Sequence, residues 1–175
     1  MNTLNKYAQA AGMTDEAWQR HANPWSVWTR FAAIPLMIAA IWSREWIGWW
    51  ALGPVGLVVV WLAVNPHVFP AIEQPRSWSA RGIYGERLWL RDRSLVTGDH
   101  RNVQRLLIGV GSAGFALLVW GLVALDPWPT VFGATLITVG QLWRIDRLGQ
   151  LYLASRDSAG KHETAPAHRS GSETA

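Results

Sequence analysis

Residues 24–64 read PWSVWTRFAAIPLMIAAIWSREWIGWWALGPVGLVVVWLAV. Apart from Arg30 and the polar triplet at 43–45, this stretch carries no charged side chain. About 20 apolar residues are enough to cross the hydrocarbon core of a bilayer as a helix. The pattern therefore predicts two membrane-crossing helices, over about 24–42 and 46–64, joined by a very short turn.

A second apolar pair follows at about 106–125 and 130–143, around the turn Asp126-Pro127-Trp128-Pro129. Between the two pairs lies the polar segment 65–105, in which residues 78–90 alternate apolar and charged side chains in a way that fits an interfacial helix. Gly82 and Gly85 weaken that prediction, because glycine disfavours helix. We expect an all-α polytopic membrane protein with four transmembrane helices and an interfacial cytoplasmic loop.

The ends of the chain differ from its centre. Residues 1–23 form a polar segment, with a short amphipathic helix predicted around Thr14–His21, where two acids follow a threonine cap. The transmembrane domain covers 24–143. Residues 144–175 are expected to form a basic, largely disordered cytoplasmic tail, rich in serine, alanine and histidine.

The composition fits this interpretation. Half of the 175 residues are hydrophobic and 16% are charged, whereas average chains have about 25% charged residues. The thirteen tryptophans suit the bilayer interface, where the ring lies among headgroups and the indole N–H finds a partner. The absence of cysteine excludes disulfides, thiolate metal sites and cysteine nucleophiles.

Basic residues predict the orientation. With four spans, fifteen of the sixteen lysines and arginines fall on the side that holds both termini, and only Arg44 falls on the other. Because basic residues are retained on the cytoplasmic side, both termini should be cytoplasmic, in a cytoplasmic (inner) membrane. These residues flank apolar segments, so anionic lipid headgroups are a better partner than nucleic acid.

In this topology the tryptophans fall into two groups. The inner interface would hold Trp25, Trp28, Trp61 and Trp143, and the outer one Trp42, Trp46, Trp49, Trp50 and Trp128.

Candidate binding residues gather on the cytoplasmic side. They are His21, Asn23, Trp25, Arg30, Asn65, His67, Glu86, Arg87, His100 and Arg101. Imidazole and carboxylate groups suit zinc or iron, but no His-Glu-x-x-His and no repeated histidine spacing is present. The sequence therefore predicts no metal site and assigns no cofactor.

Two of these residues, Glu86 and Arg30, admit two interpretations. Glu86 is either a solvated member of an ion pair or a carboxylate held near Arg30 or Arg101. Arg30, inside the first span, either has a named partner or extends to the headgroups. The Asn-Pro pairs at 23–24 and 65–66 are explained as the start of one helix and the end of another.

Several motifs together resemble a known family. They are His21-Ala22-Asn23-Pro24-Trp25-Ser26, Thr29-Arg30, Asn65-Pro66 with Phe69-Pro70, and Gly85-Glu86-Arg87 with Trp89. Over roughly His21 to Trp143 the chain looks like an uncharacterised family of small bacterial and archaeal integral membrane proteins, defined by a domain of unknown function. The resemblance implies a membrane location and no established activity.

Two functions remain open. The first is an integral membrane protein whose basic cytoplasmic face binds anionic lipid headgroups or a partner protein. The alternative is a membrane-embedded enzyme that acts on a lipid-like substrate, with His21, His67, His100 and Glu86 around a polar site. The charge-free helix cores count against a proton-coupled carrier. Four short helices bury little area, which leaves homo-oligomer formation open.

Overall fold

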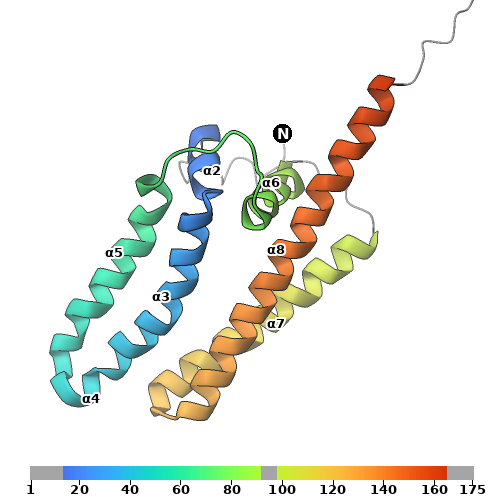
Figure 1. The fold of residues 1–175 in the computed structure, drawn as a ribbon. Coiled ribbons are helices and arrows are strands. Elements are labelled where there is room, and N and C mark those ends of the chain that lie inside the picture. The colour runs from blue at the N-terminus through green and yellow to red at the C-terminus, as the bar shows by residue number, and fades with distance from the viewer. Residues whose placement is uncertain (1–13, 92–97, 165–175) are drawn as a thin grey trace, which may run out of the picture.

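The computed structural model describes residues 14–91 and 98–164, and the side chains of 14–91 and 101–158. Within these residues the fold is all-α, with no strand. The helices are α2 (Asp15–His21), α3 (Pro24–Trp42), α4 (Arg44–Ile47), the 3₁₀ turn η1 (Gly48–Ala51), α5 (Leu52–Val68), α6 (Trp78–Arg91), α7 (Gly98–Ala124) and α8 (Pro127–Thr164). Figure 1 shows two helical hairpins, α3–α5 and α7–α8, whose turns lie at one end of the molecule. Helices α2 and α6 lie toward the opposite end.

Helices α2 and α3 begin where the sequence predicts. The Thr14 side chain accepts a hydrogen bond from the Ala17 amide at 3.2 Å and caps α2. The Asn23 side chain accepts one from the Trp25 amide at 3.0 Å, with Pro24 at the first helical position of α3. The helix α3 ends at Trp42, as expected for the first apolar segment.

The second half of the first hairpin differs from the prediction. After the turn formed by α4 and η1, α5 begins only at Leu52, so Pro54 lies in its first turn, where a missing N–H costs little and no kink is needed. The Asn65-Pro66 pair does not end the helix, which continues to Val68. Pro66 removes one hydrogen bond, but the buried Asn65 side chain holds this last turn against α3.

Arg44 connects the turn of the first hairpin to the second hairpin. Its Nη2 donates to the carbonyl oxygens of Leu122 at 2.5 Å and Val123 at 3.0 Å, in the last turn of α7. These carbonyls have no partner inside the helix, and a cation is favoured at that negative end of the helix dipole. Among the described residues, Arg44 is the one basic residue at this end of the molecule, and it caps a helix.

Glycines bring α7 and α8 together. A Cβ placed on Gly121 would lie 2.4 Å from the Thr130 amide nitrogen, and one on Gly133 would lie 2.5 Å from that of Leu118. Gly114, seven residues before Gly121, is equally enclosed by α8. Gly109 and Ala113 have the spacing of small residues at which helices often approach in lipid, but Gly109 faces open space and does not join these helices.

The helix α8 is much longer than the sequence suggests. It continues from Pro127 to Thr164, past the expected end at residue 143 and through much of the tail predicted to be disordered. The reason is packing: Ile145, Leu148 and Leu151 recur at helical spacing and are buried. The rest of that predicted tail, residues 165–175, lies outside the described residues.

Helix α6 confirms the helix predicted near 78–90, and its glycines form the contact with α8. A Cβ on Gly85 would lie 1.9 Å from the Leu148 carbonyl oxygen, and one on Gly82 would lie 2.4 Å from Ile145 Cγ2. The two helices thus approach backbone to backbone. The cost of glycine in a helix is offset here by a contact that no larger residue permits.

We expect Gly85→Ala to destabilise the protein, because the added methyl group overlaps the backbone of α8. Overpacking of this kind costs about 1–3 kcal/mol. Thermal unfolding of the purified protein in detergent should show a lowered midpoint. Gly109→Ala is the matched control: its Cβ meets nothing within 4 Å, and the helix gains propensity, so its midpoint should not fall. Equal midpoints for the two variants would contradict the close contact.

Candidate functional site

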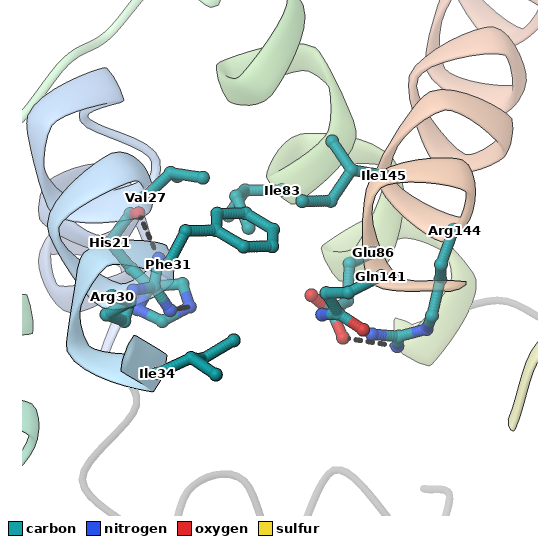
Figure 2. Close-up of a pocket in the computed structure, with 10 residues that line it drawn as sticks. All are labelled: His21, Val27, Arg30, Phe31, Ile34, Ile83, Glu86, Gln141, Arg144 and Ile145. Carbon is teal, nitrogen blue, oxygen red and sulfur yellow. Dashed lines mark hydrogen bonds and ion pairs between the residues drawn. The ribbon is translucent and has the colours of Figure 1, made fainter. Parts of the chain in front are cut away.

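A cavity of about 320 Å³ lies between α3 on one side and α6 and α8 on the other. Figure 2 shows His21 and Arg30 on one wall, and Glu86, Gln141 and Arg144 facing them. The remaining lining is apolar and includes Phe31, Ile34, Ile83 and Ile145. The cavity thus combines two cations, one carboxylate and one imidazole with an apolar floor.

Arg30 forms hydrogen bonds within the protein. Its Nη1 lies 2.7 Å from His21 Nε2, its Nε donates to the Ser26 carbonyl oxygen at 3.0 Å, and its Nη2 reaches the His21 carbonyl oxygen at 3.3 Å. These contacts hold the guanidinium at the cavity wall. Arginine only donates hydrogen bonds, so Nε2 of His21 must be the acceptor and Nδ1 must carry the proton. The guanidinium has five N–H groups, and three are used in these contacts.

The environment of His21 favours the neutral imidazole. Burial, and then the charge of Arg30, lower the pKa of His21 to about 4. The ring is therefore uncharged at neutral pH, as its hydrogen bond with Arg30 requires. Its Nδ1 is buried and has no hydrogen-bond partner among the described residues. A buried donor without an acceptor is costly.

Glu86 forms an ion pair with Arg144 of α8, with Oε1 and Nη2 2.5 Å apart. Both side chains are about one-fifth exposed, so the pair is not a freely solvated one. Its partner is neither Arg30 nor Arg101, although Glu86 lies within electrostatic reach of Arg30 across the cavity. The Nε of Arg144 is buried without a partner in the described structure.

Two of the predicted residues have structural roles outside the cavity. Asn65 is fully buried, accepts a hydrogen bond from Ser26 Oγ at 2.7 Å and donates one to Thr29 Oγ1 at 2.8 Å. The Asn23 amide donates to the Pro70 carbonyl oxygen at 3.1 Å in addition to capping α3. These contacts fasten α5 and the following segment to α3, and they account for both Asn-Pro motifs.

The other predicted residues do not line the cavity. Arg87 pairs with Asp15 and so joins α6 to α2. Trp25, His67 and Arg101 are exposed, and the side chain of His100 lies outside the described residues. Of the ten candidates the cavity therefore brings together His21, Arg30 and Glu86. Among the described side chains, no group of three or more His, Asp or Glu residues is arranged to hold a metal ion.

Two cavity residues were not selected from the sequence. Gln141 and Arg144 come from the end of the last apolar segment, where Arg144 was counted only as part of a basic tail. Their spacing of three residues places both on one face of a helix, with Ile145 beside them. That spacing is a usable signal only if the helix is known to continue beyond residue 143.

We expect the stability of the folded protein to fall as the pH drops from about 7 to 5. The pKa of His21 is lowered on folding from 6.5 to about 4, so its contribution is fully present above pH 6.5 and is lost as the pH falls toward 4. The expected loss between pH 7 and 5 is roughly 1–2 kcal/mol. The glutamine of His21→Gln still accepts a hydrogen bond but does not titrate. When unfolding midpoints are plotted against pH, we expect those of the wild type and of His21→Gln to converge at low pH. A constant difference between the two midpoints across this pH range would contradict a buried neutral histidine.

No curated protein and no solved structure matches the chain. A family model described as "Family of unknown function (DUF6653)" matches residues 3–172, nearly the whole chain and more than the His21–Trp143 region of the resemblance. The uncharacterised family expected from the motifs is thus confirmed, and the chain belongs to the DUF6653 family of unknown function.

Proposed function

We propose that the protein is a multi-pass integral membrane protein. Its α3, α5, α7 and α8 would cross the bilayer, both termini would lie on the cytoplasmic side, and its arginine-rich end would rest on anionic lipid headgroups. Two helical stretches, Pro24–Val68 and Arg101–Ala124, are long and apolar enough to cross a membrane. The first contains a complete hairpin, so it has the length for two crossings.

The observation that carries this proposal is an exposed apolar surface. In the most apolar windows of the two stretches, only 6% and 22% of the residues are buried. A core helix of a water-soluble protein would be mostly buried instead. Leu57 on α5 and Phe115 on α7 are 72% and 62% exposed. A continuous apolar surface of this kind is unfavourable in water and stable in lipid.

Exposed tryptophans bound this surface at both ends. Trp46, Trp49, Trp50 and Trp128 are exposed at the end of the hairpin turns, and Trp25, Trp28, Trp78 and Trp143 at the other end. Such bands are typical of the two interfaces of a bilayer. Between Arg105 and Ala124, α7 has no charged side chain over roughly 28 Å of helix, close to the ~30 Å of a hydrocarbon core.

The distribution of charge supports the orientation. Within the described parts of the chain, the end with the hairpin turns has a single arginine, Arg44, which caps a helix. At the opposite end the exposed arginines include Arg101, Arg105, Arg147 and Arg156. Helices α2 and α6 are joined there by the ion pairs of Asp15 with Arg87 and Arg91. This end has the composition of a surface that contacts anionic headgroups.

The enzyme alternative gains less support. His21 and Glu86 do line one cavity, but His67 lies elsewhere, and His21 is already engaged by Arg30. A neutral imidazole whose Nε2 accepts from an arginine is a poor general base, because its lone pair is occupied. A binding role for the cavity therefore fits the contacts better than proton transfer.

Single-cysteine labelling tests the topology, because the natural chain contains no cysteine. We expect Glu45→Cys, at the hairpin turn, to react with a membrane-impermeant maleimide in intact cells. Ser158→Cys and Gln74→Cys should react only after permeabilisation, since positive residues hold that end inside. Labelling of Ser158→Cys in intact cells would overturn the proposed orientation.

Replacement of exposed arginines tests the lipid contact. We expect the variant with glutamine at 101, 105, 147 and 156 to lose most of the thermal stabilisation that anionic vesicles give relative to zwitterionic ones. Each basic residue near a membrane surface contributes about 1 kcal/mol, and salt screens the effect. The matched control is the variant with lysine at the same four positions, because lysine keeps the positive charge. Equal stabilisation of the two variants would contradict an electrostatic role.

A further inference from the structure

We propose that the groove between the two hairpins is a binding site for one phospholipid, with the phosphate in the cavity of Arg30 and Arg144 and one acyl chain along α3 and α8. This inference rests on the proposed membrane location and adds the ligand class. Two adjoining cavities, hydrogen-bond donors left over at the polar end and the charge between the hairpins support it.

The polar cavity continues into an apolar slot. The slot has a volume of about 340 Å³ and is lined by Ile34, Pro35 and Ile38 of α3 and by α8 from Thr130 to Val139. Ile34 lines both cavities, so they adjoin along α3. A slot of this volume, open on one side, is of the scale of an alkyl chain.

The slot persists because the hairpins are held together at their ends. Toward the turns, Arg44 binds the last carbonyls of α7. At the other end Trp78 of α6 stacks on Trp28 of α3, with ring centroids 6.4 Å apart, and donates from Nε1 to Asp146 of α8 at 3.0 Å. Between these two contacts the groove lies along α3 and α8, and in a bilayer an apolar groove of this size would be filled by lipid.

The polar end lacks acceptors. Arg30 retains two N–H groups beyond its three contacts, and the Arg144 guanidinium, which has five N–H groups, gives one to Glu86. A ligand that supplies only acceptors, such as a phosphate, would complement this set. An ammonium headgroup would add donors where donors are already in excess.

The charges favour an anionic lipid. Arg30 and Arg144 face one carboxylate, Glu86, and His21 is neutral, so the cavity has one excess positive charge. One phosphodiester of an otherwise uncharged headgroup balances it. The structure thus favours a monoanionic phospholipid, such as phosphatidylglycerol, over a zwitterionic one, whose second charge has no free partner there.

Native mass spectrometry of the protein in detergent, titrated with phosphatidylglycerol or phosphatidylcholine, tests the site. We expect the wild type to retain one phosphatidylglycerol at concentrations where phosphatidylcholine is not retained. Arg30→Gln should weaken this binding at least tenfold, because it removes the cation at the polar end. Arg76→Gln, at an exposed arginine outside both cavities, should bind as the wild type does.

Variants of the slot test the acyl chain. Ala134→Trp fills the slot, and Val139→Trp does so from a position that is already 54% exposed and therefore tolerates a large side chain. Both should lower retention of the lipid at least tenfold. Val60→Trp, on α5 and 58% exposed, is the matched control and should leave retention unchanged.

Three results would overturn the site. They are unchanged retention in both Val139→Trp and Arg30→Gln, equal retention of the two lipids by the wild type, and displacement of the lipid by glycerol phosphate or inorganic phosphate at equal concentration. The last result would mean that the headgroup alone binds. A failed membrane assignment is recognised separately, because the cysteine labelling does not depend on the groove.

Discussion

Exposed apolar helix surface is the constraint on which the rest of this structure depends. The fold leaves Leu57, Phe115 and Val123 mostly exposed, and in the proposed membrane location these side chains lie in lipid rather than in water. Lipid also requires that every backbone polar group be satisfied internally, which only helices and closed barrels achieve. The positions of the charges, the tryptophans and the capping contacts are then consequences of this one requirement.

Polar contacts at the ends of the hairpins compensate for a sparse interior. The buried bonds of Asn65 with Ser26 and Thr29 join α3 to α5, and Arg44 joins the first turn to α7. The α6–α8 contact uses Gly82 and Gly85 so that backbones meet. In lipid, an apolar side chain is as well accommodated by acyl chains as by another helix. Hydrogen bonds and close glycine contacts then determine which helices pair.

Local signals in the sequence predicted part of this. Cap residues such as Thr14 and Asn23 mark helix starts because they satisfy amides of their own first turn, and the apolar segments identify the hairpin helices. The sequence does not predict the extension of α8 past residue 143, because its buried face forms only when α6, about 60 residues away, and α7 pack against it. For the same reason Gln141 and Arg144 were not selected, although His21, Arg30 and Glu86 were.

The membrane assignment can be tested by washing membranes from expressing cells with alkaline carbonate, which releases peripheral proteins. If the four helices cross the bilayer, the protein stays in the membrane pellet and leaves it only with detergent. If the protein appears in the carbonate supernatant, or sediments with soluble proteins before the wash, its apolar surface is covered by something other than lipid.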